Sequence, residues 1–323
     1  MQRFYLVALA VVFASWTGEA LQPQPECTVT LRPEDSIQKA IDAAAPGMVL
    51  CLEEGVWDES LLIYKDITIR GAGPDKTVVR SRAMVWTELP ITVVIQGLSI
   101  AGAVVQGPIR VTFQDTHLEA DGIYIIGDAT VDFSRANLSV SGFGLVLFGQ
   151  VKVTLVDSQV DGGGKSLTGI MVLGGAAQLN LVNSRVMNNE IGISAGVGEA
   201  LLYITLERSL IARNKRAGLS AGGFAHIEIH ESTIEGNGAD SQTCMICLGS
   251  ICAICPGIEV SDQAKVVISN SRIANNWDWG VSARLRKCGY ARDEFAGAVV
   301  FEGENIITGN NRSGKFVGEV CLP

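Results

Sequence analysis

His226, Glu228 and His230 alternate with two isoleucines, and their types and spacing are the most suggestive of chemistry. Alternation of polar and apolar residues predicts a β-strand with all three polar side chains on its outward face. Residues two apart on a strand lie about 6.6 Å apart, so the two histidines lie about 13 Å apart and cannot share one metal ion. His226 and Glu228 can form an acid/base pair. The alternative, which we prefer, is an ordinary solvated face.

A basic run precedes this strand and consists of Arg208, Arg213, Lys215 and Arg216. A β-eliminating polysaccharide lyase needs a cation to neutralise a uronate and a base to take its proton. The run and the histidine–glutamate pair are therefore the best candidates for lyase-like catalysis on an acidic glycan. Charged turns that keep the protein soluble are the simpler interpretation.

Eight cysteines are present, and four of them follow the pattern Cys-x2-Cys-x4-Cys-x2-Cys: Cys244, Cys247, Cys252 and Cys255. Paired Cys-x2-Cys motifs bind zinc or iron–sulfur clusters, but this spacer is shorter than in most zinc ribbons. In an oxidising compartment an even number of cysteines usually forms disulfides. We therefore expect two disulfides within this quartet and neither a metal nor a cofactor, with a structural metal or redox chemistry as the alternatives. Two further disulfides are expected, Cys27–Cys51 and Cys288–Cys321.

The first 20 residues have the pattern of a signal peptide. Arg3 supplies a positive start, residues 6–14 are apolar, and small residues follow from Gly18. The apolar run is too short for a membrane helix, and no later segment is apolar enough to span a bilayer. A buried N-terminal strand is the alternative. We therefore expect a secreted, periplasmic or cell-surface protein without a membrane span.

The composition limits the classes of function. Apolar residues make up 47% of the 323-residue chain, which argues against disorder. The formal net charge of -9 argues against nucleic acid as a partner, because phosphate binding needs a basic face. A glycan or a protein surface remains as the expected partner.

An eleven-residue phrase recurs along the chain with its apolar positions intact. In every copy the first, third and eighth positions are aliphatic or Phe, and the sixth is mostly small. A period in the twenties with variable spacers predicts a solenoid, because each repeat buries its apolar face only against its neighbours. The sixth-position residues Ser184, Ser209, Ser232 and Ser271 should then form one column. The copies start at Val93, Val111, Val131, Val153, Leu179, Ile204, Ile227, Val266 and Val299.

A short helix is expected before the repeats, with Asp35 as its N-cap and Gln38 three residues later. It would cover the open end of the strand stack. The predicted organisation is a signal peptide at 1–20, a β-helix domain at 21–310 and a C-terminal tail at 311–323. A Cys-rich insertion at 238–256 interrupts the domain.

These features resemble the right-handed parallel β-helix proteins of the pectin-lyase-like superfamily. The segment SIQKAIDAAAPGMVLCLEEGVWDESLLIYKDITIRGAG is similar to the superfamily's usual entry segment, and the repeats are similar to its coils. The resemblance implies an all-β, right-handed parallel β-helix of eight to ten rungs with an N-terminal capping helix. It transfers no catalytic residue, because the catalytic motifs of the superfamily's polygalacturonases, pectate lyases and alginate epimerases are missing from this sequence.

Outward positions on three successive turns carry large apolar side chains. Between the repeats, a Gly is often followed by an Ile or Leu that begins a short strand. If that Ile or Leu points inward, the first and third residues after it point outward. Six such side chains exceed what a monomer usually exposes, and they predict a binding surface. An error of one residue in the register would turn all of them inward. They are Tyr124, Ile126, Val146, Phe148, Met171 and Leu173.

The sequence favours an exported, non-catalytic β-helix whose surface binds a glycan or a protein. The alternative is a polysaccharide-processing, lyase-like enzyme that acts on an acidic glycan through the basic run. We prefer the first because no recognised catalytic set is present.

Overall fold

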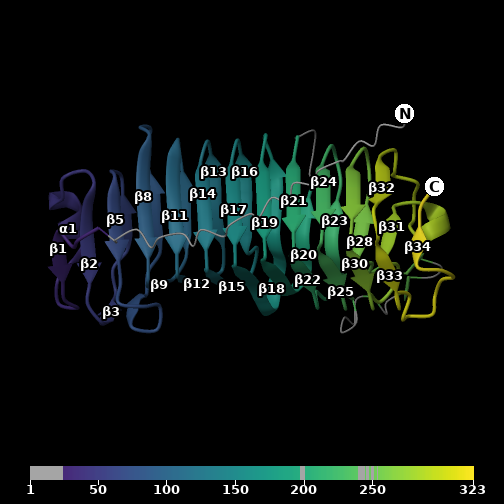
Figure 1. Ribbon diagram of the computed structural model, residues 1–323, viewed down its shortest axis with the longest axis horizontal. Coiled ribbons are helices and arrows are strands. Elements are labelled where there is room, and N and C mark those ends of the chain that lie inside the picture. Colours follow the sequence, from purple (N-terminus) through teal and green to yellow (C-terminus); the bar gives the residue numbers. More distant parts are fainter. Residues whose placement is uncertain (1–24, 197–200, 239–243, 245–246, 249–250, 253) are drawn as a thin grey trace, which may run out of the picture.

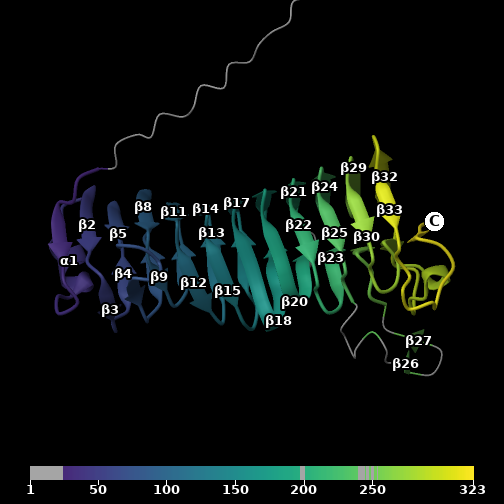
Figure 2. The ribbon, with the colours of Figure 1, turned by 60° about the horizontal axis from the view of Figure 1, so that its bottom comes forward.

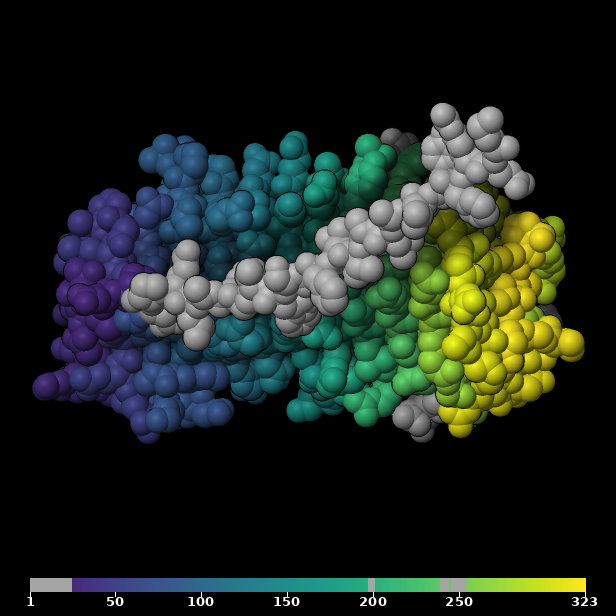
Figure 3. Space-filling model, in the orientation of Figure 1, coloured from purple at the N-terminus to yellow at the C-terminus, as the bar shows by residue number. Residues whose placement is uncertain are grey.

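The computed structural model describes residues 25–323 except for 197–200, 239–243, 245–246, 249–250 and 253. The predicted signal peptide, 1–20, lies outside the described residues. The described chain forms an elongated stack of short strands, and sequence order runs along its long axis (Figure 1; Figure 3). Helix α1 (Ile37–Ala43) lies at one end of the stack and the C-terminus at the other.

Each complete turn contributes one strand to each of three faces, which we number face 1, face 2 and face 3 in chain order. Strands of successive turns pair in parallel on every face, for example β14 (Thr130–Ser134) with β17 (Lys152–Val156) and β13 (Ile123–Gly127) with β16 (Leu145–Gly149). Face 1 is a 12-stranded sheet. Faces 2 and 3 form one 20-stranded sheet, because two long strands, β18 (Gln159–Gly174) and β20 (Arg185–Ala195), run through both. The predicted parallel β-helix is confirmed.

The strands divide among the three faces in chain order. Face 1 contains β1 (Val29–Leu31), β2 (Met48–Leu52), β5 (Ile67–Arg70), β8 (Ile91–Gln96), β11 (Ile109–Gln114), β14 (Thr130–Ser134), β17 (Lys152–Val156), β19 (Gln178–Val182), β21 (Tyr203–Glu207), β24 (His226–His230), β29 (Lys265–Ser269) and β32 (Ala298–Glu302). Face 2 contains β3 (Gly55–Trp57), β6 (Thr77–Val79), β9 (Ser99–Ile100), β12 (His117–Ala120), β15 (Asn137–Val140), the first parts of β18 (Gln159–Gly174) and β20 (Arg185–Ala195), β22 (Leu210–Ala212), β25 (Thr233–Glu235), β30 (Arg272–Ala274) and β33 (Ile306–Thr308). Face 3 contains β4 (Leu61–Ile63), β7 (Ala83–Trp86), β10 (Ala103–Gln106), β13 (Ile123–Gly127), β16 (Leu145–Gly149), the last parts of β18 and β20, β23 (Ala217–Ala221), β28 (Ile258–Val260), β31 (Val281–Ala283) and β34 (Val320–Cys321).

The apolar repeat positions fill the interior. Val111 and Phe113, at the first and third positions of one copy, are fully buried, as are Val131 and Phe133 on the next turn. The two phenyl rings stack with their centroids 5.1 Å apart. Burial of each large apolar side chain contributes about 1.5 to 3 kcal/mol, so the repeated period by itself stabilises a continuous core.

The serines at the sixth repeat position form one column, as predicted. The backbone N–H of Ser184 donates to Oγ of Ser209 at 3.1 Å, Ser209 donates likewise to Ser232 at 3.0 Å, and Ser232 to Ser271 at 3.1 Å. This column lies at the turn between face 1 and face 2, which we call corner 1. The serines therefore satisfy backbone donors that the sharp turn removes from the sheets.

A second column, of buried asparagines, lies at the turn between face 2 and face 3, which we call corner 2. Asn237 Oδ1 accepts hydrogen bonds from the backbone N–H of Asn214 at 3.1 Å and from its Nδ2 at 2.9 Å. Asn237 in turn donates from its backbone N–H to Asn276 Oδ1 at 3.1 Å and from its own Nδ2 at 2.9 Å. Each amide therefore links three turns.

Replacement of Asn237 by Ala is expected to destabilise the protein by about 1 to 3 kcal/mol, because it leaves the buried N–H of Asn214 without an acceptor. Urea unfolding followed by circular dichroism measures this loss. Asn180→Ala is the matched control, because Asn180 faces outward on β19 and its loss is expected to change stability by less than about 0.5 kcal/mol. Equal effects of the two substitutions would contradict a structural role for the asparagine column.

The N-terminal cap is confirmed, with one correction. Ile37 and Ile41 of α1 are buried against the first turns. The N-cap is Ser36, whose Oγ accepts from the backbone N–H of Lys39 at 3.1 Å. The carboxylate of Asp35 instead accepts a hydrogen bond from the backbone N–H of Arg32, in the turn that precedes the helix. No helix in the described part of the chain is long and apolar enough to cross a membrane.

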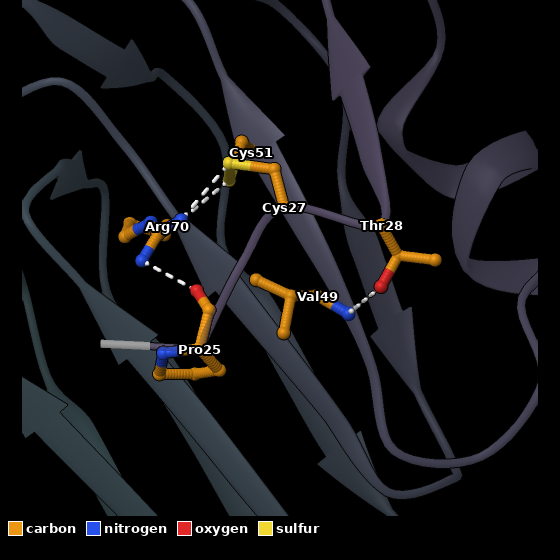
Figure 4. Close-up of a disulfide and its surroundings, with 6 residues drawn as sticks. All are labelled: Pro25, Cys27, Thr28, Val49, Cys51 and Arg70. Atoms are coloured by element: carbon orange, nitrogen blue, oxygen red, sulfur yellow. Dashed lines mark hydrogen bonds between the residues drawn. A yellow bond between two sulfur atoms is a disulfide. The ribbon is translucent and has the colours of Figure 1, made fainter. Parts of the chain in front are cut away.

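The predicted Cys27–Cys51 disulfide is present and ties β1 to β2, with a Cα–Cα separation of 5.6 Å (Figure 4). Arg70, on the next strand of face 1, packs over the disulfide. Its guanidinium donates to Cys27 Sγ at 2.9 Å and to the carbonyl oxygen of Pro25 at 3.0 Å (Figure 4). The disulfide and these hydrogen bonds therefore attach the segment that precedes β1, which contains Pro25 and Cys27, to the first two turns.

Two further disulfides lie near the other end. Cys288, in the 3-10 helix η2 (Arg286–Cys288), is bonded to Cys321 as predicted. Cys244 is bonded to Cys255 within the Cys-rich insertion, so a site with four cysteine ligands is excluded. Val320 pairs with Val281 of β31, so the sheet continues into the segment predicted as a tail.

The other two cysteines of the quartet lie on a small hairpin formed by β26 (Cys247–Leu248) and β27 (Ile251–Cys252). The two strands are antiparallel, and Cys247 is the register partner of Cys252. The hairpin projects from the solenoid near its C-terminal end (Figure 2). This register agrees with the predicted second disulfide of the quartet, which stays a prediction.

Candidate functional site

The predicted acid/base residues lie on face 1. His226, Glu228 and His230 point outward from β24, and His226 Nε2 lies 3.1 Å from Glu228 Oε1. The ring of Tyr203 on the preceding turn lies 5.9 Å from the imidazole, and Lys265 is the register partner of His226 on the following turn. These groups can exchange protons, but they stand on a strand face where solvent screens their charges.

The basic run does not assemble beside this group, contrary to the lyase-like prediction. Arg208 lies at corner 1, where its backbone N–H donates to the carbonyl oxygen of His230, at the opposite end of β24 from His226. Arg213, Lys215 and Arg216 come after β22 and therefore lie across face 2 from corner 1. Arg208 and Arg213 are separated because the three-residue strand β22 lies between them, so they fall at two different corners of the solenoid.

Three arginines do converge at corner 1, in an open hollow of about 410 Å³. Arg185, Arg208 and Arg272 line it together with Glu231 and Glu235. Arg208 lies 4.0 Å from Glu231, and Arg272 lies 3.8 Å from Glu235. Because two of the three cations are paired with carboxylates, the hollow offers little net attraction for a uronate polymer.

Face 3 carries the predicted apolar side chains outward, which confirms the predicted register. Leu145 and Leu147 of β16 are fully buried, whereas Phe148 is 53% exposed. On β13, Ile125 is buried and Ile126 is partly exposed. The apolar residues that face solvent are therefore not displaced core residues.

The outward residues stack into two columns. Tyr124 pairs with Val146 and Ile126 pairs with Phe148 between β13 and β16. Val146 is almost buried, since it lies between Tyr124 and Met171 in its column. A β-bulge after Leu147 shifts the register, so Phe148 stands opposite Gly174.

The same surface continues towards the N-terminus beyond the predicted six residues. Met84 and Trp86 on β7 are each 46% exposed, and Leu62 on β4 is 41% exposed. Register pairs join Leu62 to Met84 and Met84 to Val104. We call the outward residues on and next to β4, β7, β10, β13, β16 and β18 the apolar stripe. One register column contains Leu62, Met84, Val104, Tyr124, Val146 and Met171, and the other contains Trp86, Gln106, Ile126 and Phe148. Tyr64, just after β4, and Leu173, one residue before the register partner of Phe148, extend the second column at its two ends.

The apolar stripe is narrow, flat and uncharged. Six strands about 4.8 Å apart make it roughly 24 Å long, and two columns make it roughly 10 Å wide. Glycines form the edge after the strands, with φ of 106° at Gly149 and 85° at Gly175. A Cβ atom on Gly175 would lie 2.2 Å from the carbonyl oxygen of Gly149, so this edge has to stay free of side chains. Asp, Glu, Lys and Arg are absent from the two columns.

On later turns the first column becomes polar and is covered. Glu259 occupies it on β28 and is buried beneath the segment that contains Arg284 and Tyr290, with Arg284 Nε 3.8 Å from its carboxylate. Burial, followed by the nearby charge of Glu259, raises the pKa of Tyr290 well above its usual value of 10.0, so the phenol stays protonated. Its hydroxyl lies 2.8 Å from Ser282 Oγ. The exposed apolar stripe thus ends before these turns.

A polar groove of about 680 Å³ lies on face 2 of the same turns that carry the stripe. Glu119, Ser139 and Asp161 follow one another in a register column on its floor. An excursion of β18 between Gly162 and Lys165 forms one wall. Asp161 Oδ1 accepts from the backbone N–H of Gly163 at 2.9 Å, which fixes the base of this wall.

Sequence reasoning missed the groove and the N-terminal half of the stripe. The groove had a signal, because the repeats that start at Val131, Val153 and Leu179 are 22 and then 26 residues apart. The longer spacer contains the residues that build the wall. The first two strands of the stripe have the same alternation, in which Leu62 and Met84 follow inward residues, but no glycine directly precedes β4 or β7.

Three solved structures align with this chain at low sequence identity, and the first of them supports the likeness of fold. The A-module of the Azotobacter vinelandii mannuronan C-5 epimerase AlgE4 aligns with a TM-score of 0.52 and 14% identity, over 88% of this chain and 94% of that chain. The catalytic domain of the GH87 α-1,3-glucanase in complex with nigerose aligns with a TM-score of 0.45 and 12% identity, over 94% and 69%. The periplasmic alginate epimerase AlgG aligns with a TM-score of 0.45 and 9% identity, over 90% and 82%. No curated protein matches the sequence.

A family model described as "Right handed beta helix region" matches residues 121–318, which is more than half of the chain. The matched residues begin just before β13 and include every later strand of the solenoid except β34. This match confirms the right-handed coil expected from the sequence. The chain therefore belongs to the right-handed β-helix family.

Proposed function

We propose that this protein is exported and binds an uncharged glycan chain along the apolar stripe. The observation that carries the proposal is the run of outward-facing, mostly apolar side chains over six strands, interrupted by Gln106, with Trp86 and Phe148 as its most exposed rings. Sugar rings present apolar faces that pack against aromatic side chains, and a linear polymer matches a surface that is long and narrow.

The dimensions of the stripe favour a glycan over a second protein. Its area is roughly 250 Å² from the strand spacing, whereas a stable protein interface buries about 800 Å² on each partner. The absence of charged side chains in the stripe favours a neutral polymer. The net charge of -9 also disfavours long-range attraction of a polyanionic glycan.

Two further observations agree with this proposal. The disulfides at both ends of the solenoid are typical of proteins that fold in an oxidising compartment outside the cytosol. The A-module that aligns with this chain is a mannuronan C-5 epimerase, which agrees with a glycan ligand in general, although mannuronan is a uronate polymer and not a neutral one. The likeness covers the fold alone, so the ligand is argued from the stripe.

Replacement of Trp86 or Phe148 by Ser is expected to weaken binding to the neutral glycan about tenfold each, because each removes one ring platform without touching the core. Affinity electrophoresis in gels that contain neutral or uronate polysaccharides measures the retardation. We expect the wild-type protein to be retarded by neutral polymers only.

Phe224→Ser is the matched control, because Phe224 is a comparably exposed aromatic residue that lies outside the stripe, in the turn before β24. It should leave retardation unchanged. Wild-type migration that no polysaccharide alters would overturn the glycan proposal. A sedimentation change in the Trp86 variant would instead identify a second copy of the chain as the occupant.

A lyase that acts on an acidic glycan is the second candidate. The group formed by Tyr203, His226, Glu228 and Lys265 is the observation that favours it, because it brings an acid, a base and a cation together on neighbouring strands. A lyase releases unsaturated product from uronate polymers, which appears as new ultraviolet absorbance. That signal, lost on His226→Ala, would favour the lyase.

A further inference from the structure

The face 2 groove contains a serine placed to act as a nucleophile. Ser139 lines the groove on β15, and its Oγ lies 3.0 Å from Nε2 of His117 on β12 of the preceding turn. Both side chains are half-buried. A hydroxyl within hydrogen-bond reach of an imidazole is the arrangement that activates serine, because the imidazole takes the proton as the oxygen attacks.

We propose that Ser139 and His117 form a catalytic dyad that hydrolyses small acyl esters in this groove. Glu119 lies two residues after His117 on the same outward face of β12 and lines the groove. Asn137 and Lys165 line the groove and are the donors available to the oxyanion that develops on the ester carbonyl.

The reaction balances with water as the only co-reactant. Ser139 Oγ bonds to the carbonyl carbon while its proton passes to His117 Nε2. The bond to the alcohol oxygen then breaks, and that oxygen takes the proton from His117, which leaves an acyl ester on Ser139. Water attacks this ester, gives its proton to His117 and releases the acid, and Ser139 Oγ recovers the proton.

The charges of the groove indicate the substrate class. Glu119, Asp121 and Asp161 line it with Lys165 as the only cation among its lining residues, so esters without negative charge are favoured. Asp121 also connects the groove to the apolar stripe, because it accepts from Arg82 at 2.8 Å and the Arg82 guanidinium lies 6.0 Å from the Tyr124 ring. We therefore assign acyl groups on a neutral glycan as the substrate; this choice of alcohol rests on the proposed function, whereas the ester chemistry does not.

Hydrolysis of p-nitrophenyl acetate tests the dyad without any glycan. Ser139→Ala and His117→Ala are each expected to lower the rate above background at least 100-fold, while circular dichroism melting stays unchanged because both residues face outward. A fluorophosphonate probe should label Ser139, as located by mass spectrometry of the digested protein, and His117→Ala should abolish the label. Loss of the label in the His117 variant would show that His117 activates Ser139 as a nucleophile, because a merely structural role of His117 would leave the labelling unchanged.

Ser269 provides the matched control, because its Oγ lies 2.9 Å from His230 Nδ1 but it does not line the groove. Ser269→Ala should change neither the rate nor the labelling. Absence of both hydrolysis and label in the wild-type protein would overturn the dyad. A loss of activity in the Ser269 variant alone would overturn the assignment of the activity to the groove. If acetylated neutral glycan is not deacetylated while p-nitrophenyl acetate is, the choice of alcohol fails and the ester chemistry stands.

Discussion

Leu147→Asp is expected to unfold the solenoid locally and to lower stability by more than about 4 kcal/mol, whereas Phe148→Asp is expected to change it by less than about 1 kcal/mol. The two residues are neighbours on β16, but Leu147 is fully buried and Phe148 is 53% exposed. A carboxylate at position 147 would lie between Ile125 and Val172 in the interior column, where no polar group can pair with it.

Urea unfolding of the two variants measures the difference, with the circular dichroism of the native state as a check on folding. The pair is its own control, because the substitution introduces the same side chain one residue apart. Similar losses for both would mean that the register on face 3 is wrong, and the apolar stripe would then be part of the core.

Removal of the Cys288–Cys321 disulfide is expected to cost about 3.7 kcal/mol, from the loop-closure entropy of its 33-residue separation. The double variant Cys288→Ala, Cys321→Ala avoids a free thiol. Cys288 is fully buried, and its carbonyl oxygen accepts from Trp279 Nε1 at 3.1 Å, so the segment it anchors is also packed against the last turns. The disulfide therefore fastens the segment that covers Glu259.

Thermal unfolding of the double variant, compared with the variant that lacks Cys27 and Cys51, measures this effect. The N-terminal disulfide closes a shorter loop, with a separation of 24 residues, and its loss is expected to cost about 3.4 kcal/mol. A C-terminal variant as stable as the wild type would show that packing alone holds the last turns.

The architecture could be predicted because the period of apolar residues is a local property that each repeat carries. Ser184 and Ser209 stack since their repeats place them at the same position, and no distant residue alters that choice. The same reasoning oriented Phe148 outward. It misplaced the N-cap by one residue, because Asp35 and Ser36 are both good capping residues and only the backbone conformation at Ser36 selects it.

The candidate sites could be predicted only in part, because they depend on contacts between turns. Arg208 and Arg213 are close in sequence, but a strand places them at different corners of the solenoid. Ser139 and His117 are in contact although they lie at different positions of two successive repeats. Only the stacked structure shows such diagonal neighbours.

The sequence by itself determined the coil, its register, two of its disulfides and the outward direction of the side chains, since all of these follow from periodicity and from cysteine positions. The pairing of Cys244 with Cys255 came from the structure. The tertiary structure alone decided which outward residues stay exposed. In the folded chain Glu259 is buried beneath a later segment and Trp86 remains exposed to solvent. The excursion of β18 forms one wall of the groove that Ser139 lines. Exposure depends on the lengths and paths of the spacers between repeats, and these are set by packing against other turns rather than by the repeat itself.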